Sequence, residues 1–281
     1  MSAETPWGSH ARQWSRVGPP LRPSPEDVAV ARSSIESWRA ANRFRDPTIL
    51  LMGVTPELCS IPTGRRSRLI AVDRSLEMIR SVWPGRLRPH DEALCGEWRR
   101  LPIRADSVDM ILSDGCLSTL DYPSGYAIAC AELLRTLRGG GRFVARCFVQ
   151  ARDPESVEDV LATLDHGANG SFHAFKWRLA MALQPDAETG VVLAEVWEAL
   201  HQAEPEFEDL SRRCGWRIEA VRTIDAYRGV SARYSFPPLD ALCDLLSDAG
   251  FEILERSHPA YELGERCPTL ILAPRDGKGR E

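Results

Sequence analysis

The chain has 281 residues, a formal net charge of −5 and 27% charged residues, a composition typical of a globular protein with enough apolar material for a core. No apolar run is long enough to cross a bilayer, and the acidic balance leaves no basic footprint for nucleic acid. We therefore expect neither a membrane nor a nucleic acid as the partner.

The cysteines and histidines show no metal-binding or disulfide pattern. The eight cysteines form no CxxC pair, and neither an HExxH motif nor a His/Asp cluster is present. The start of the chain lacks the basic and apolar regions of a secretory signal. These observations predict reduced thiols, no metal, and a cytoplasmic location.

Residues 1–46 are expected to form an N-terminal lid or cap segment. Ser24 can cap a helix that has Pro25 at its first position, and apolar residues then recur at helical spacing as far as Trp38. The stretch upstream is flanked by prolines and is predicted to be irregular. It contains Trp7 and the candidate lid residues His10 and Trp14.

Strands and helices alternate from residue 47 to residue 150, which predicts a doubly wound, mostly parallel sheet of an α/β protein. The helices are expected in "SLEMIRSVW" and "GYAIACAELLRTLR", and "GGG" is expected to form a tight turn before the last of these strands. The expected buried strands are 48–54, 68–73, 108–114 and 142–149.

The rhythm breaks in residues 151–236, which contain three helical stretches and no buried strand between them, so we expect a mainly helical insertion that caps the core. Residues 237–275 return to the core with a helix stopped by Gly250 and two strands, 251–257 and 267–275, which can form a hairpin. Residues 276–281 are expected to be a frayed tail.

Ligands of open α/β sheets bind at the carboxyl ends of the strands. The first predicted strand ends in "GVTPE", where Gly53 allows close approach to a ligand and Thr55 before Pro56 suits a helix start with a hydroxyl cap. The second ends in Asp73, placed to accept hydrogen bonds from both hydroxyls of a ribose.

The next two junctions add groups that suit an adenosyl cofactor. Gly96-Glu97-Trp98 offers a carboxylate for the adenine amino group and an aromatic ring beside the base. The strand at 108–114 ends in Asp114, followed by Gly115.

Taken together, "LLMGVTPEL", "LIAVDRSLEMI", "GEWRRLPIRADSVDMILSDG" and "ELLRTLRGGGRFVAR" resemble a class I S-adenosylmethionine-dependent methyltransferase with a Rossmann-like fold. The resemblance covers about residues 48–150 and the terminal helix and hairpin. It implies a seven-stranded sheet whose last strand is antiparallel, S-adenosyl-L-methionine as cofactor, and methyl transfer as the reaction. Thr55 and Glu57 stand where the family usually has its second and third glycines.

The resemblance also assigns roles to particular residues. It places the methionine end of the cofactor against Gly53, Val54, Thr55 and Glu57, the ribose on Asp73, the adenine side against Arg74 and Met78, the base beside Gly96, Glu97 and Trp98, and the sulfonium region in front of Asp114 and Gly115.

Because a sulfonium methyl is already activated, such an enzyme needs no fixed catalytic triad, and none is present. The acceptor pocket is expected to come from the N-terminal segment, the insertion and the strand at 142–149. One buried stripe of the insertion is predicted at Phe172, Phe175 and Leu179, with His173, Lys176 and Trp177 on another face. The acceptor-pocket candidates are Trp14, His10, Arg146, His173, Lys176, Trp177, Tyr227 and Arg228, each of which has packing or surface exposure as its alternative role.

A cap of this size favours a small-molecule acceptor over a polymer. Two alternatives remain at this stage: a non-catalytic scaffold or partner subunit with the same fold, and an NAD(P)-dependent oxidoreductase, which shares the glycine and the acid but normally has a G-x-G-x-x-G motif that this chain lacks. The acceptor atom and the oligomeric state are left open by the sequence.

Overall fold

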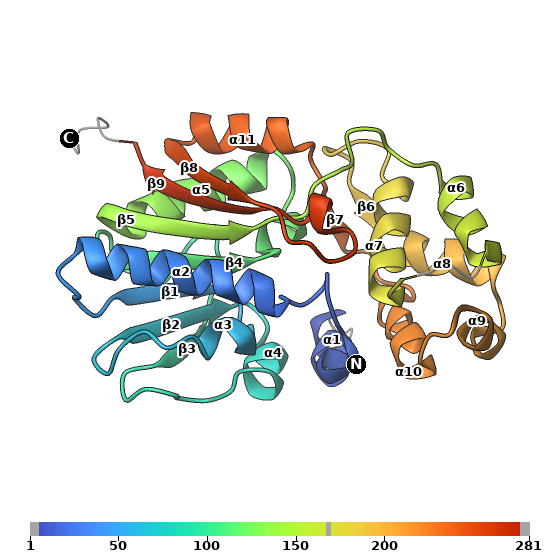
Figure 1. Ribbon diagram of the computed structural model, residues 1–281, viewed down its shortest axis with the longest axis horizontal. Helices are drawn as coiled ribbons and strands as arrows, with labels where there is room; N and C mark the ends of the chain where they lie inside the picture. Colours follow the sequence, from blue (N-terminus) through green and yellow to red (C-terminus); the bar gives the residue numbers. More distant parts are fainter. Residues whose placement is uncertain (1–5, 167–169, 276–281) are drawn as a thin grey trace.

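A seven-stranded sheet lies at the centre of the computed structural model, which describes residues 6–166 and 170–275 (Figure 1). The strand order is β3-β2-β1-β4-β5-β9-β8. The first five strands pair in parallel, whereas β9 is antiparallel to both of its neighbours. The predicted doubly wound sheet with one antiparallel strand is confirmed. The strands are β1 (Thr48–Met52), β2 (Arg68–Asp73), β3 (Glu92–Cys95), β4 (Val108–Asp114), β5 (Leu137–Arg146), β8 (Phe251–Ser257) and β9 (Thr269–Pro274).

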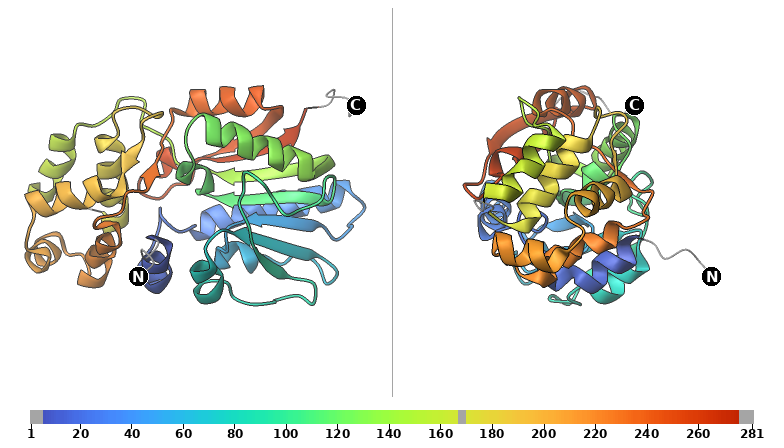
Figure 2. Two further views of the ribbon diagram at one scale, coloured as in Figure 1. Left: turned by 180° about the vertical axis from the view of Figure 1, so that it is seen from behind. Right: turned by 90° about the vertical axis from the view of Figure 1, so that its right-hand side faces the viewer.

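Helices cover both faces of the sheet (Figures 1 and 2). Side chains of α2, α3 and α4 pack with one set of strand residues in one apolar cluster, and side chains of α5 and α11 pack with the alternate set in another. Strands β1 and β4 are buried on both faces, which explains their continuous apolar runs. The helices are α2 (Pro25–Ala41), α3 (Pro56–Cys59), α4 (Leu76–Ser81), α5 (Ser124–Thr136) and α11 (Leu239–Asp248).

The start of α2 follows the sequence prediction. The Ser24 hydroxyl accepts from the Asp27 N–H at 3.3 Å, the Asp27 carboxylate accepts from the Ser24 N–H at 2.7 Å, and Pro25 occupies the first turn. Further along the helix, the Trp38 indole N–H donates to the Gly140 carbonyl at 3.1 Å. These contacts fix the helix against the sheet.

The prediction of an irregular stretch upstream of α2 was wrong. Residues Pro6–Gln13 form helix α1, and a short 3₁₀ helix continues at Trp14–Arg16. Helix α1 contacts α4 on the sheet side and the 3₁₀ helix Arg222–Tyr227 of the insertion, so it bridges the two parts of the molecule. The side chains of Trp7 and His10 lie outside the described part of the structure.

The glycine triplet 139–141 also differs from its prediction. It lies within β5, where Gly140 has a φ of +76° and the pairing with β4 shifts between Val108 and Met110. The glycines therefore accommodate an irregularity inside a strand rather than a turn before it.

The insertion forms a helical unit beside the carboxyl ends of the parallel strands, on the right of Figure 1. It was predicted to have no buried strand between its three helical stretches, but Val191–Val192 (β6) lies between two of them and pairs antiparallel with Arg233–Tyr234 (β7). The predicted tail at residues 276–281 lies outside the described residues. Among the described residues, no helix is long and apolar enough to span a membrane. The helices of the insertion are α6 (Val157–Ala162), α7 (Phe172–Leu183), α8 (Leu193–Ala203), α9 (Phe207–Cys214) and α10 (Ile218–Val221).

Helix α7 is buried almost all round. Phe172, Phe175 and Leu179 are buried as predicted, but His173, Lys176 and Trp177 on the other face are buried too, each at most 6% exposed. The prediction of a single buried stripe was therefore wrong: one face packs inside the insertion, and the other faces the rest of the molecule.

Candidate functional site

A cleft lies between the carboxyl ends of β1, β2 and β4 and the helical insertion, with about 950 Å³ of empty space when its open mouth is included. Three parts of the chain line it. The N-terminal segment contributes Trp14, Val17 and Leu21; the core contributes Gly53, Val54, Thr55, Asp73, Arg74, Met78, Trp98, Asp114, Gly115, Cys116, Ser118, Thr119 and Phe148; the insertion contributes Lys176, Trp177, Tyr227 and Tyr234.

Gly53 and Asp73 face each other at the floor of the cleft. Gly53 has a φ of +82°, and a side chain built there would place its Cβ 3.8 Å from Asp73 Oδ2. The other carboxylate oxygen, Oδ1, accepts from the Ser75 N–H at 2.8 Å. Burial raises the pKa of Asp73 above its ordinary value, although the Ser75 N–H and Arg74 oppose the rise. A buried acid of this kind is stabilised by further hydrogen-bond donors.

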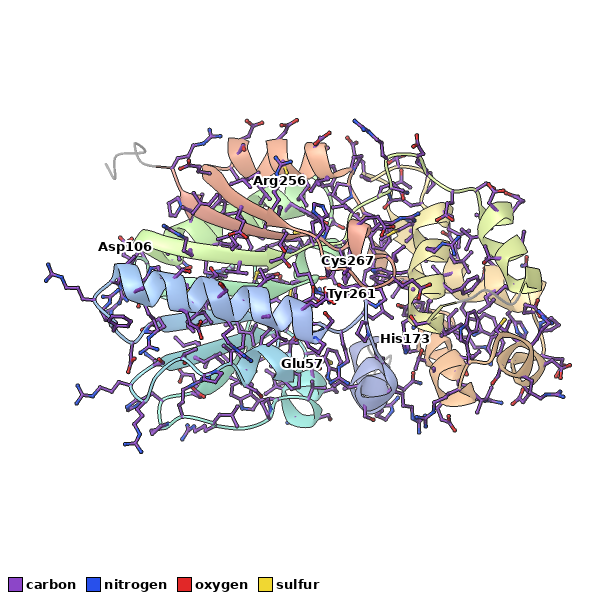
Figure 3. The ribbon with its side chains drawn as sticks, in the orientation of Figure 1. Glu57, Asp106, His173, Arg256, Tyr261 and Cys267 are labelled. Atoms are coloured by element: carbon purple, nitrogen blue, oxygen red, sulfur yellow. The ribbon has the colours of Figure 1, made fainter. Side chains whose placement is uncertain are left out.

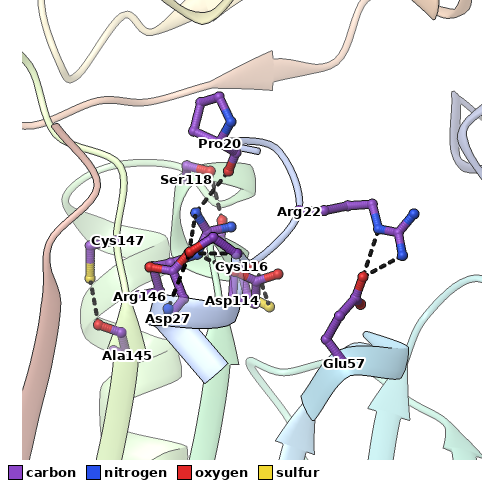
Figure 4. A network of polar contacts seen from close by, with 12 residues as sticks. Pro20, Arg22, Asp27, Glu57, Asp114, Cys116, Ser118, Ala145, Arg146 and Cys147 are labelled. Atoms are coloured by element: carbon purple, nitrogen blue, oxygen red, sulfur yellow. Dashed lines mark hydrogen bonds and ion pairs between the residues drawn. The ribbon is translucent and has the colours of Figure 1, made fainter. Parts of the chain in front are cut away.

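Glu57, which stands at a usual glycine position of the first turn, does not block the cleft. The Glu57 side chain does not line the cleft; its Oε1 accepts from Arg22 Nε at 2.8 Å and also from Arg22 Nη2 (Figure 4). Thr55 does line the cleft, but its hydroxyl makes no capping hydrogen bond, so the predicted cap of α3 was wrong. Glu57 therefore leaves the cleft open and holds the N-terminal segment in place.

Arg22 extends this link. Its Nη1 donates to the Trp14 carbonyl at 3.0 Å, and its guanidinium lies 5.2 Å from the centre of the Trp14 ring. Trp14, a predicted lid residue, thus lines the cleft from a segment fixed to the core through Glu57.

Of the three residues at the third junction, the structure brings one into the cleft. Trp98 lines it, and its indole N–H donates to the Val72 carbonyl at 2.6 Å, which fixes the ring. Glu97 lies outside and pairs with Arg99. Gly96 is also outside: a Cβ there would lie 2.9 Å from Pro102, so close packing accounts for this glycine.

Arg146 lies behind the cleft rather than in it. Its Nε donates to Asp114 Oδ1 at 2.6 Å and its Nη1 to the Pro20 carbonyl at 2.8 Å, with both charged side chains 4% exposed (Figure 4). Burial alone would lower the pKa of Arg146, but Asp114 and Asp27 raise it above its ordinary value, so it stays charged. The predicted cationic clamp is thus committed to Asp114, which does line the cleft.

Two other predicted acceptor residues also lie outside the cleft. His173 points to the N-terminal segment, with Nε2 3.1 Å from the Arg16 carbonyl, and burial and Lys176 lower the pKa of His173 to about 4 (Figure 3). Arg228 is exposed, with its guanidinium 5.0 Å from the Trp197 ring centre.

The insertion brings three of the predicted acceptor-pocket residues, Lys176, Trp177 and Tyr227, to the cleft. Phe148 and Tyr234 were missed, because Phe148 follows the end of a strand in an irregular stretch and Tyr234 belongs to the unpredicted two-stranded ladder. Cys116, Ser118 and Thr119 were also missed, although they directly follow Asp114-Gly115, and that position was the available signal.

Comparison with family models matches one region of the chain. Residues 53–145 match a family model described as "Methyltransferase domain". The search of curated proteins found no match.

Solved structures share the fold at low sequence identity. A protein from Rhodobacter sphaeroides, provisionally named a Zn-dependent alcohol dehydrogenase, is 13% identical with a TM-score of 0.58, and the match covers 95% of this chain and 98% of the other. A Pyrococcus horikoshii protein whose name states no function is 14% identical with a TM-score of 0.50, covering 94% and 99%. A Methanosarcina mazei protein named as an S-adenosylmethionine-dependent methyltransferase is 15% identical with a TM-score of 0.49, covering 84% and 96%.

At these identities the structural likeness shows the fold alone, so the names of the neighbours are not carried over. The match over residues 53–145, the motifs and the sheet order with its single antiparallel strand all concern this core region. Residues 53–145 therefore form a methyltransferase domain, of the class I, S-adenosylmethionine-dependent kind that the motifs resemble.

Proposed function

We propose that this chain transfers a methyl group from S-adenosylmethionine to a small-molecule acceptor held between the sheet and the insertion. The observation that carries the proposal is one continuous cleft whose floor is built from strand ends and whose opposite wall is built from the insertion. Methyl transfer between two small molecules needs such a paired arrangement, because the two reacting atoms must be held in line.

The residues of the floor fit the cofactor. Asp73 has an oxygen that faces the cleft and suits ribose hydroxyls, and Gly53 leaves room for close approach. Met78 and Trp98 offer an apolar edge and a fixed ring for adenine. When bound, the cofactor supplies an activated methyl group; the chain supplies its orientation and the exclusion of water.

Enclosure supports a small acceptor. The N-terminal segment and the insertion both line the cleft, so a bound acceptor would be covered on these sides. The eight cysteines, all within the described residues, form no disulfide with one another, and this supports a cytoplasmic location.

The test is turnover. Purified protein is incubated with S-adenosylmethionine labelled in its methyl group and with a panel of small aromatic acids, phenols and amines; formation of S-adenosylhomocysteine and of a labelled product is followed by mass spectrometry. We expect labelled product with at least one acceptor class and none with Asp73→Ala. Cofactor binding without turnover on any class, or on cell extract, would instead support the non-catalytic scaffold.

A further inference from the structure

Lys176 is an unusual cation for this chain. Only two of the 35 basic residues are lysines, Lys176 and Lys278, so arginine is the default positive side chain. Yet Lys176 lines the cleft from α7 while being only 1% exposed. An arginine is permanently charged and needs a planar set of partners, whereas a lysine is a compact charge that can also lose its proton.

The contacts of Lys176 do not neutralise it. Its Nζ donates to the Thr223 hydroxyl oxygen at 3.2 Å, and the Thr223 hydroxyl in turn donates to the Ala220 carbonyl at 2.6 Å. The ammonium also lies 4.8 Å from the Tyr227 ring centre and 5.8 Å from that of Phe172. Among the described residues, no carboxylate forms an ion pair with it, and burial is the cause that lowers the pKa of Lys176, to about 7. A buried cation without a counter-ion is costly, and an anion entering the cleft would remove much of that cost.

Aromatic rings that line the same cleft as Lys176 are held in place by contacts with one another. The Trp177 ring packs edge-on against Phe148, Tyr234 and Phe236, with ring centres 5.1, 5.4 and 5.2 Å apart. Phe148 and Tyr234 line the same cleft. Aromatic walls held in this way favour a planar ligand that stacks or packs edge-on against them.

We propose that the methyl acceptor is a planar aromatic acid, and that Lys176 binds its anionic group, a carboxylate or a phenolate. The role of this ligand as methyl acceptor rests on the proposed function. The binding of an aromatic acid by Lys176 does not. The anion would pair with Nζ in the aromatic part of the cleft, at the wall opposite Asp73.

The pH dependence separates the two kinds of acid. A carboxylate needs the charged ammonium, so its affinity falls as pH rises through and above about 7. A phenol brings its own proton, which can move to the neutral amine to form the same ion pair. Its affinity therefore rises with pH up to about 7, where the lysine is still charged and the phenol must release its proton, and stays level above that until the phenol itself ionises. Nearby titratable groups do not produce this pattern. Burial keeps His173 on α7 neutral, and burial raises the pKa of Tyr227 and Tyr234, which keeps both uncharged. Three charged groups also line the cleft: Asp73 at the end of β2, Arg74 in the loop between β2 and α4, and Asp114 at the end of β4.

The experiment is calorimetric titration of the full chain at pH 6 and pH 9 with matched probes. 2-Naphthoate is compared with uncharged 2-naphthamide, and 2-naphthol with 2-methoxynaphthalene. The proteins are wild type, Lys176→Met, Lys176→Gln as a second uncharged variant, and Arg222→Met, which removes an exposed cation next to Thr223 on the outside of the insertion. Circular dichroism checks that each variant is folded.

We expect the wild type to prefer at least one acid over its neutral partner about tenfold or more at pH 6. The preference should vanish in both Lys176 variants and persist in Arg222→Met. If naphthoate is the preferred probe, its advantage should shrink about tenfold or more at pH 9. Lack of preference in either pair, or a preference that survives loss of Lys176, would overturn the inference. If neither variant folds, loss of the naphthoate preference at pH 9, or a naphthol preference that is kept or increased at pH 9, supports the inference, and any other pattern overturns it.

A separate titration with S-adenosylhomocysteine keeps the two proposals distinguishable. Wild type that binds S-adenosylhomocysteine but shows no preference dependent on Lys176 would leave the proposed function standing and remove this inference. Wild type that shows the preference but does not bind S-adenosylhomocysteine would leave this binding site standing and remove the proposed function.

Discussion

At the scale of single residues, two buried cations near the cleft differ in whether they have a counter-ion. Arg146 and Asp114 neutralise each other within the described core, at 2.6 Å and 4% exposure. Lys176 has a hydroxyl and two rings but no counter-ion among the described residues. A buried charged group that lowers the free energy of unfolding and lines a cleft is often a functional residue.

Lys176→Met should therefore stabilise the free protein. Burial lowers the pKa of Lys176 from 10.5 to about 7, so at pH 7 and below both the folded and unfolded chains carry the proton and the folded chain bears the full cost. Between pH 7 and 10.5 the unfolded chain binds a proton that the folded chain lacks, so wild-type stability rises with pH. The slope approaches about 1.4 kcal/mol per pH unit.

Urea unfolding of both proteins at pH 7 and pH 10 measures this. We expect the variant to be the more stable at pH 7 and the difference to narrow at pH 10. A variant that is less stable at pH 7 would mean that the lysine contributes more to packing than its burial costs.

Gly115 gives a second test at this scale. It has a φ of +66°, and a Cβ there would lie 2.2 Å from Phe148 Cε2. Gly115→Ala should cost about 2 kcal/mol of unfolding free energy and displace a ring that lines the cleft. Gly139→Ala is the matched control, since nothing lies within 4 Å of its Cβ position. Equal stability of the two variants, measured in urea, would contradict the packing described for Phe148.

At the scale of elements, the ion pair of Arg22 with Glu57 joins the stretch before α2 to the altered glycine turn of the core. Arg22 and Glu57 are each about one fifth exposed in their side chains, and Arg22 also holds the Trp14 and Val17 carbonyls. Helix α1 contacts both α4 and the insertion. The segment is therefore placed to set access to the cleft, and its position depends on a residue in the altered glycine turn.

Arg22→Met should destabilise the protein by about 1–2 kcal/mol, because it leaves the Glu57 carboxylate partly buried without its partner. Adding Glu57→Gln to that variant should recover part of the loss, since the orphaned charge is then gone. Limited proteolysis within residues 1–24 should become faster in both variants. Slow cleavage equal to wild type in Arg22→Met would show that the ion pair does not hold the segment.

At the scale of the whole molecule, the architecture could be read from the sequence because its signals are local. Buried parallel strands appear as continuous apolar runs. Ser24 indicates the start of α2, and Gly250 indicates the end of α11. The misses arose where local signals are weak. Two-residue strands such as β6 and β7 carry no period, and α1 begins beside a proline that suits either a loop or a helix start.

The site was less predictable than the fold, since lining a cleft depends on contacts between distant segments. The strand-end rule found Gly53 and Asp73 because such residues meet at one edge of the sheet. No local pattern could show that Arg22 would draw Glu57 away from the cleft, or that Arg146 would be committed to Asp114.

The most direct test of the account is calorimetric titration of S-adenosylhomocysteine into wild type, Asp73→Asn and Asp121→Asn, the last being a control at an exposed acid. We expect saturable binding by wild type and by the control, and affinity lower by about 1–3 kcal/mol for Asp73→Asn, as befits the loss of buried hydrogen bonds to a carboxylate. Unchanged affinity in Asp73→Asn, or a wild type that binds NADH and not S-adenosylhomocysteine, would contradict it.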